Sequence, residues 1–321
     1  VTFGIYKLGQ WILKGPQHCG QLFCVDIGFP KQLIQEIANT HSVFTHKDFI
    51  KCLPVHADTS HKAHHGHVKV WAGSPGMWGA GLLTAQAAYR LGAGYVTLET
   101  DEPYFAQIPE LLVEKSSPLE DKYTYAVGPG WKNTPTHSKR LHKLAHLRLS
   151  KVILDAEALN IIAQEAPLQP LPGSWILTPH SQEMSRLLNL SSAQDIEEDR
   201  PHAVLQAHQH YHCTVLLKGY RTLIATQGKV YVIPTGNAAL AKAGSGDVLT
   251  GIIASFRAQG LTDTQASLAG AYIHGLMADI WIQKNHINTM TPSDILKGLP
   301  KVLKKLTLGQ SPLKPTTLSP T

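Results

Sequence analysis

The sequence lacks most of the features that mark secreted or membrane-bound proteins. Its 321 residues include only four cysteines, at positions 19, 24, 52 and 213, whose spacing fits neither a Cys-x-x-Cys site nor a disulfide framework. No apolar run reaches the roughly 18 residues of a membrane span. No basic-then-apolar signal peptide opens the chain. We therefore expect a cytoplasmic protein with no membrane partner and no structural zinc site.

Several motifs of known chemistry are also missing. There is no Walker phosphate loop and no Gly-x-Ser-x-Gly nucleophile elbow, and the turn at residues 73–76 lacks the Gly-x-Gly-x-x-Gly spacing of a dinucleotide loop. Any phosphate must therefore be held in another way. The histidine clusters have no cysteine or carboxylate at matching spacing, so we predict solvated side chains and no metal site at His61, His64, His65, His67, His142, His146, His208, His210 and His212.

Charge and composition favour an α/β protein that binds small anions. The formal charge is +6 and hydrophobic residues make up 43% of the chain. Because the basic residues are mostly scattered, we expect no nucleic-acid partner and favour an anionic metabolite. Strand-like and helix-like runs alternate along the chain, which is typical of a parallel sheet covered by helices.

A βαβ unit begins the main domain. A strand at 68–72 leads through a glycine-rich turn into a helix at 81–91 and a second strand at 95–99. Right-handed crossovers then predict a doubly wound sheet with helices on both faces and ligands at the carboxyl ends of its strands. Further strands are expected at 123–127, 151–154, 174–177 and 214–217, a hairpin at 222–233, and helices at 245–259, 262–283 and 291–305.

The stretch Gly244-Ser245-Gly246-Asp247 is the strongest candidate for a chemical site. The two glycines permit positive φ and a close approach, so that backbone N–H groups at the start of the helix could hold a phosphate or an oxyanion. Asp247 would lie in the first helical turn, where it could take a proton from a hydroxyl. The alternative is an ordinary helix start after a glycine loop.

Polar residues follow three other predicted strands, where a doubly wound sheet presents its ligands. Asp155 could cap a helix or contact a ligand. His180 could contact substrate, although capping explains its neighbours. Lys218 and Gly219 suit the phosphates and ribose of a nucleotide, or a simple hairpin turn.

Eight motifs in chain order, spanning about residues 61–306, resemble the ADP- or ATP-dependent NAD(P)H-hydrate dehydratases, a branch of the ribokinase-like superfamily. These motifs are Gly73-Ser74-Pro75-Gly76, Leu91-Gly92-Ala93-Gly94, Gly128-Pro129-Gly130, Leu154-Asp155-Ala156, Leu177-Thr178-Pro179-His180, Leu217-Lys218-Gly219, Pro234-Thr235-Gly236-Asn237 and Gly244-Ser245-Gly246-Asp247. Residues 1–30 resemble the end of the NAD(P)H-hydrate epimerase domain that often precedes this dehydratase. We interpret residues 31–60 as a linker and 307–321 as a disordered tail.

The resemblance implies repair of hydrated NADH and NADPH. The nucleotide would phosphorylate the hydroxyl of the hydrated nicotinamide, and phosphate would then be eliminated. Asp247 would be the catalytic base and a substrate contact, and Mg²⁺ would bridge the phosphates. The resemblance assigns the nucleotide, either ADP or ATP, to Lys218, Gly219, Tyr220, Arg221, Thr222, Asn237, Gly244, Ser245 and Gly246. It assigns the hydrated dinucleotide to Ala80, Gly130, Lys132 and His180.

Three departures from the family pattern bear on substrate affinity. Ala63, Lys132 and Gln182 each stand where the family usually has glycine, so permissive backbone conformations are lost there. Two other functions remain open: a ribokinase-like small-molecule kinase that keeps its phosphorylated product, and a degenerate member that binds nucleotide without turnover. The family commonly forms homo-oligomers, and a tetramer is the expected form.

Overall fold

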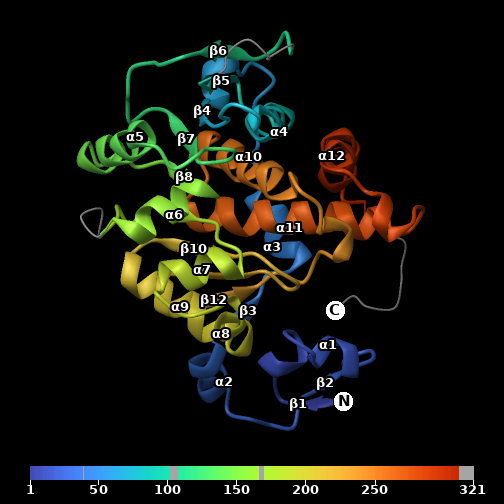
Figure 1. Cartoon of the computed structure of the whole chain (residues 1–321). Helices are drawn as coiled ribbons and strands as arrows, with labels where there is room; N and C mark the ends of the chain where they lie inside the picture. Colours follow the sequence, from blue (N-terminus) through green and yellow to red (C-terminus); the bar gives the residue numbers. More distant parts are fainter. Residues whose placement is uncertain (39, 102–107, 166–169, 311–321) are drawn as a thin grey trace.

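One mixed sheet organises the part of the chain that this computed structural model describes, residues 1–38, 40–101, 108–165 and 170–310 (Figure 1). Within it, ten strands hydrogen-bond in the order β3-β12-β11-β10-β9-β8-β7-β4-β5-β6. All neighbours run parallel except β11, which is antiparallel to β10 and β12. The strands are β3 (His41–Val43), β4 (His67–Trp71), β5 (Tyr95–Glu99), β6 (Leu112–Glu114), β7 (Thr124–Val127), β8 (Val152–Leu154), β9 (Ile176–Leu177), β10 (Thr214–Leu217), β11 (Leu223–Thr226) and β12 (Lys229–Val232).

Helices cover both faces of this sheet, because alternate strand residues are apolar on opposite sides. Leu216 belongs to one buried cluster and Leu217 to the other. The first cluster is shared with α3 (His46–Cys52), α4 (Trp78–Arg90), α10 (Ser245–Ala258), α11 (Asp263–Trp281) and α12 (Pro292–Thr307). The second is shared with α5 (Pro135–His146), α6 (Glu157–Gln164), α7 (Ser181–Leu187), α8 (Ala193–Glu198) and α9 (Arg200–Tyr211). The prediction of a mainly parallel, doubly wound α/β fold is confirmed.

The strand order reverses beside β4. From β4 the chain passes through α4 to β5 on one side, and it later returns to β7 on the other side. The Gly73 backbone N–H, just after β4, donates a hydrogen bond of 2.8 Å to the Pro129 carbonyl just after β7. The carboxyl ends of β4, β7, β8, β9 and β10 are therefore neighbours at one edge, where such sheets bind ligands.

Residues 41–52 do not form the linker that was expected for 31–60. β3 extends the main sheet by pairing in parallel with β12, and α2 (Lys31–Ala38) precedes it. On α3, the side chain of Phe49 is fully buried and stacks on Tyr272 of α11, with ring centroids 4.9 Å apart. The linker prediction failed because a three-residue strand is too short to show an alternating pattern.

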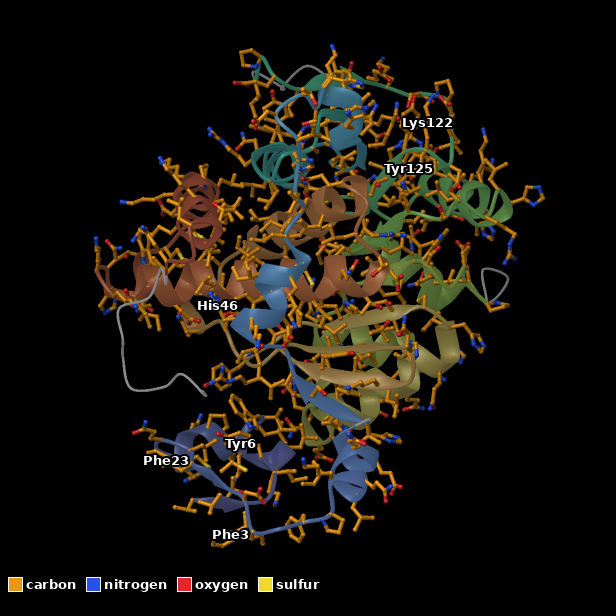
Figure 2. The ribbon with its side chains drawn as sticks, turned by 180° about the vertical axis from the view of Figure 1, so that it is seen from behind. Phe3, Tyr6, Phe23, His46, Lys122 and Tyr125 are labelled. Carbon is orange, nitrogen blue, oxygen red and sulfur yellow. The ribbon has the colours of Figure 1, made fainter. Side chains whose placement is uncertain are left out.

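The first 30 residues form a small unit beside α8 and α9 (Figure 1). β1 (Thr2–Phe3) and β2 (Cys24–Val25) pair in parallel, and α1 (Gly15–His18) lies between them in sequence. Ile12 is buried in the cluster that α9 shares. Figure 2 shows Phe3 and Phe23 on this unit, where both side chains are more than half exposed.

The C-terminal helix ends one residue into the predicted tail. α12 closes at Thr307, residues 308–310 follow it, and the rest of that tail, 311–321, lies outside the described residues. Among the helices that the structure describes, none has the length and apolarity to cross a membrane.

Candidate active site

The predicted cradle lies at the start of α10. Gly244 is the N-cap residue and has a φ of +89°, the left-handed conformation that glycine adopts without strain. Gly246 does not have the expected positive φ. Gly246 instead lies close to Lys218, because a β-carbon at position 246 would be 3.5 Å from the Lys218 ammonium nitrogen. The N-terminus of α10 therefore faces Lys218, the residue that follows β10.

Asp247 lies in the first turn of α10, as expected. Burial, assisted by repulsion from Asp155, raises the pKa of the Asp247 carboxyl to about 6, although Lys218 acts in the opposite direction. A carboxylate with a pKa near 6 is mostly ionised at neutral pH but is a stronger base than an exposed aspartate. This residue is therefore suited to accept a proton from a substrate hydroxyl.

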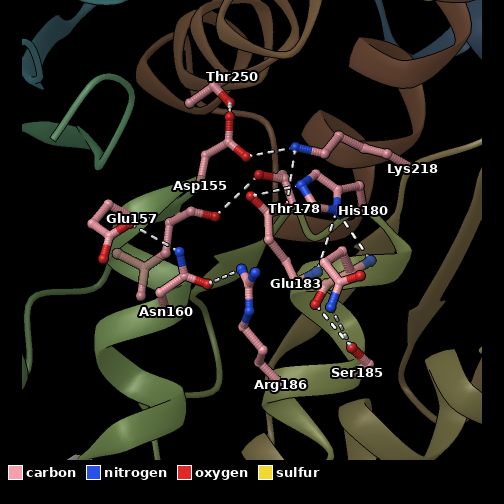
Figure 3. A network of polar contacts seen from close by, with 12 residues as sticks. Asp155, Glu157, Asn160, Thr178, His180, Glu183, Ser185, Arg186, Lys218 and Thr250 are labelled. Carbon is pink, nitrogen blue, oxygen red and sulfur yellow. Dashed lines mark hydrogen bonds and ion pairs between the residues drawn. The ribbon is translucent and has the colours of Figure 1, made fainter. Parts of the chain in front are cut away.

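Lys218 is held by a buried aspartate at the end of β8 (Figure 3). Its Nζ donates a hydrogen bond of 2.7 Å to Asp155 Oδ1, while the Thr250 hydroxyl of α10 donates one of 2.7 Å to Asp155 Oδ2. Asp155 makes no helix-capping hydrogen bond to α6. Of its two interpretations, the helix cap is therefore wrong. Burial would lower the pKa of the Lys218 ammonium, but Asp155, Glu183 and Asp247 raise it above its ordinary value.

His180 caps α7 and also borders this group. Its Nδ1 accepts hydrogen bonds from the backbone N–H groups of Gln182 and Glu183, at 3.1 and 3.2 Å. The ring proton is consequently assigned to Nε2, which lies 3.3 Å from Glu183 Oε1. Burial raises the pKa of the Glu183 carboxyl to about 7, and its Oε2 lies 3.7 Å from Lys218 Nζ. The capping and ligand interpretations of His180 are thus compatible.

The predicted nucleotide loop at residues 218–222 rests on a buried arginine. Arg200 donates hydrogen bonds to the carbonyls of the two residues before Gly219. A β-carbon at Gly219 would lie 2.5 Å from the guanidinium. Tyr220 is half exposed, and the guanidinium of Arg221 lies 5.1 Å from the centre of its ring. The Thr222 hydroxyl donates to the Gly219 carbonyl at 3.2 Å, which closes the turn.

Asn237 and Ser245, two other predicted nucleotide contacts, use their side chains inside the fold. Asn237 Nδ2 donates a hydrogen bond of 2.9 Å to Asp279, and its Oδ1 caps the short helix that follows. The Ser245 hydroxyl lies 3.1 Å from Nε2 of His274, whose pKa burial lowers to about 4. Both side chains therefore already have partners in the fold, and the Ser245 backbone N–H donates a hydrogen bond of 3.2 Å to the Lys242 carbonyl.

Two of the predicted dinucleotide contacts, Ala80 and Gly130, lie against each other at the strand-order reversal. A β-carbon on Gly130 would lie 2.9 Å from the Ala80 β-carbon. Lys132 is exposed and has no positive φ, so the lysine in place of the family's glycine introduces no backbone strain. Its carbonyl oxygen lies 2.7 Å from Nδ1 of His137, a buried residue that stacks on Trp131. The turn that contains Gly130 also packs against the chain at Asp155, because a β-carbon on Gly128 would lie 2.0 Å from the Asp155 carbonyl oxygen.

Two carboxylates at the site were not predicted as site residues. Asp155 was left open between two interpretations, and Glu183 was explained by capping alone. The available signal was position: Asp155 immediately follows β8, and Glu183 lies in the first turn of α7, the helix that follows β9. Across the described stretches of chain, no three His, Cys, Asp or Glu side chains are arranged to hold a metal ion by themselves.

Comparison with known proteins identifies the family. The model of the NAD(P)H-hydrate dehydratase family matches residues 68–301. The chain belongs to this family. It is 40% identical over 237 residues to the ADP-dependent (S)-NAD(P)H-hydrate dehydratase of Neisseria meningitidis, which covers 70% of this chain and 80% of that protein. It is 36% identical over 329 residues to the bifunctional NAD(P)H-hydrate repair enzyme of Moorella thermoacetica, covering 95% of this chain and 62% of the relative.

Solved structures agree with the family assignment. An ADP/ATP-dependent NAD(P)H-hydrate dehydratase from Bacillus subtilis, co-crystallised with ATP and Mg²⁺, has a TM-score of 0.73 and 28% identity, over 83% of this chain and 98% of that one. A ribokinase-like superfamily protein from Enterococcus faecalis, 24% identical with a TM-score of 0.72, shows the same fold. This chain spans about 60% of the length of the first bifunctional relatives it matches, 62% and 59%.

Proposed function

We propose that this chain dehydrates the hydrated nicotinamide of NADH and NADPH in a reaction driven by a nucleotide. The observation that carries the proposal is the arrangement at the start of α10. There, Asp247 has a pKa raised to about 6 beside the Lys218 ammonium and the backbone N–H groups of the cradle. Family membership supplies the substrate class.

The proposed chemistry has two steps. Asp247 removes the proton from the substrate hydroxyl while the hydroxyl oxygen forms a bond to the terminal phosphorus of the nucleotide, and the bond from phosphorus to the leaving nucleotide breaks. The cradle N–H groups and Lys218 stabilise the phosphoryl group during this transfer. In the second step the carbon–oxygen bond breaks, phosphate leaves, and loss of a proton from the adjacent ring carbon restores the double bond.

We infer that the nucleotide lies over residues 218–222 and the cradle, and the dinucleotide over Ala80, Gly130, Lys132 and His180. Relatives are named for ADP, and one related structure was co-crystallised with ATP and Mg²⁺. Mg²⁺ usually keeps waters and phosphate oxygens as ligands and needs few protein groups. The residues here fit such an ion, because three carboxylates, those of Asp155, Glu183 and Asp247, interact with the single ammonium of Lys218 and leave a net negative charge. Bound with the phosphates, the ion would neutralise their charge.

A direct test is absorbance at the reduced-nicotinamide band after hydrated NADPH is mixed with protein, Mg²⁺ and either ADP or ATP. We expect a nucleotide-dependent rise, and a loss of about 10²- to 10⁴-fold in rate for Asp247→Asn with nucleotide binding retained. A phosphorylated product that accumulates without recovery of NADPH would instead indicate a small-molecule kinase. Nucleotide binding with a flat trace would indicate a degenerate member.

We also propose that residues 1–30 are the end of an epimerase domain. The dehydratase domain would consist of residues 61–306, together with strand β3, which pairs with its sheet. The bifunctional relative aligns over 95% of this chain. Apolar side chains are exposed on residues 1–30, as expected for a surface that another domain covers; they are Val1, Phe3, Phe23, Val25, Ile27 and Phe29.

We expect a cytoplasmic homo-oligomer, and the family resemblance suggests a tetramer. Light scattering would measure the mass of the assembly.

A further inference from the structure

The side chain of Asp155 connects three elements of the site. It is 2% exposed and leaves the carboxyl end of β8. One oxygen accepts a hydrogen bond from Lys218 after β10, and the other accepts one from Thr250, one turn into α10. Each carboxylate oxygen therefore has its own donor, and both bonds are 2.7 Å long (Figure 3). A buried carboxylate with two such donors has little freedom to move.

The ammonium of Lys218 depends on this carboxylate for its position. Asp155 is its hydrogen-bonded partner, whereas Glu183 Oε2 is farther away at 3.7 Å. The same ammonium approaches Gly246 of the cradle. A long, flexible lysine side chain would otherwise have several rotamers available, which costs entropy when it must meet a phosphoryl group.

We propose that Asp155 is a positioning residue of the dehydratase: together with Thr250 it holds the Lys218 ammonium beside Gly246 of the cradle. The inference rests on the proposed function, because the cradle and Asp247 are its reacting groups. Asp155 itself need not touch either substrate.

The charges around Asp247 give this arrangement an electrostatic consequence. From β8 the Asp155 carboxylate repels the charged form of Asp247, and from β10 the Lys218 ammonium attracts it. At the start of α7, Glu183 and His180 interact electrostatically with Lys218 and Asp155. From α11, His274 is mostly neutral above its lowered pKa of about 4. After burial, Asp155 is the largest contribution that raises the pKa of Asp247.

The decisive variant is Asp155→Asn, which keeps the shape and removes the charge. With that charge gone, repulsion of Asp247 is lost and Lys218 is free to turn toward it, so both changes lower the pKa of Asp247. We expect a downward shift of about one unit. The pKa is read from the ¹³C carboxyl resonance, which is assigned from its absence in Asp247→Asn. This measurement needs no turnover, so it tests the inference separately from the proposed function.

Steady-state kinetics supplies a second measurement. Asp155→Asn should reduce kcat by about 10²-fold, because a misplaced group near the reacting atoms costs that much. It should raise the KM values much less, and the acidic limb of the pH profile should move to lower pH. A merely structural residue would not move that limb.

Thr250→Val tests the same inference if Asp155→Asn folds poorly. The substitution preserves shape and removes one donor to Asp155, so kcat should fall by roughly tenfold with little change in KM. Thr226→Val is the matched control, because Thr226 is also buried and hydrogen-bonded through its hydroxyl, but to Thr214 and Thr264. Its kcat should remain that of the unaltered protein.

Two results would overturn the inference. One is an Asp247 pKa that is unchanged in folded Asp155→Asn. The other is a Thr250→Val variant whose kcat matches that of Thr226→Val. If the unaltered protein restores no NADPH while the pKa shift is found, the proposed function fails and the arrangement of Asp155, Lys218 and Asp247 stands.

Discussion

Gly130 lies against Ala80 so closely that a β-carbon added at position 130 would come within 2.9 Å of the Ala80 β-carbon and 2.5 Å of the Met77 carbonyl oxygen. The turn after β7 and the first turn of α4 are thus in contact at the point where the strand order reverses. Gly130 also has a φ of +64°, so a side chain there is disfavoured both by conformation and by space.

Gly130→Ala should therefore destabilise the fold and raise the KM for the hydrated dinucleotide. Gly228→Ala is the matched control, because Gly228 also has a positive φ but has no neighbour within 4 Å of the new β-carbon. We expect Gly130→Ala to cost about 1–3 kcal/mol more than the control in the free energy of unfolding. Denaturant titration measures this difference, and equal costs for the two variants would contradict the predicted clash.

Asp247→Asn should stabilise the protein at high pH. The folded pKa of Asp247, about 6, lies above the value of about 3.9 for an unfolded aspartate. The folded state therefore binds more protons between these values, and stability is lost as pH rises through 6. We expect a gain of about 1–2 kcal/mol at pH 8 and none at pH 3.5.

Asp294→Asn provides the opposite sign for comparison. Its hydrogen bond from Thr291 lowers the pKa of the Asp294 carboxyl, so its contribution to stability is present above the unfolded pKa and is lost as pH falls. This substitution should destabilise at pH 8. Thermal denaturation at the two pH values measures both variants, and a gain from Asp247→Asn that is equal at both would show that charge is not the cause.

Phe49→Ala should cost about 3–5 kcal/mol in the free energy of unfolding, because a fully buried ring stacked on Tyr272 is removed. Ile50→Ala, on the same helix but 37% exposed, should cost less than about 1 kcal/mol. Denaturant unfolding distinguishes the two. Similar small losses would mean that α3 is not part of the core.

Lys132→Gly tests whether the lysine that departs from the family pattern weakens binding of hydrated NADPH. The side chain is exposed and its backbone is unstrained, so we expect the free energy of unfolding to change by less than about 1 kcal/mol. The KM for hydrated NADPH should change by less than about threefold, as titration of substrate in the absorbance assay would measure. A KM that falls tenfold would show that the lysine obstructs the substrate.

Local patterns predicted the main sheet well because most of its strands are apolar runs bounded by turn residues. The predicted strands at 95–99 and 214–217 coincide with β5 and β10. The start of α10 at Ser245 was also predicted, since glycine and serine mark that boundary in the sequence itself.

The parts that sequence reasoning missed depend on distant partners. β3 has three residues, and its strand identity comes from hydrogen bonds with β12, far along the chain. Asp155 and Lys218 are 63 positions apart, so no spacing rule pairs them. The ordinary φ of Gly246 could not be read either, because glycine permits both signs and the surrounding helix decides.

The burial of Ile12 beside α9 has a mechanical consequence. The N-terminal unit therefore packs on α9 through a side chain inside a shared core, in addition to being joined to the main body through the chain. A proteolytic cut in the exposed stretch near Gly28 would leave the two pieces associated until unfolding.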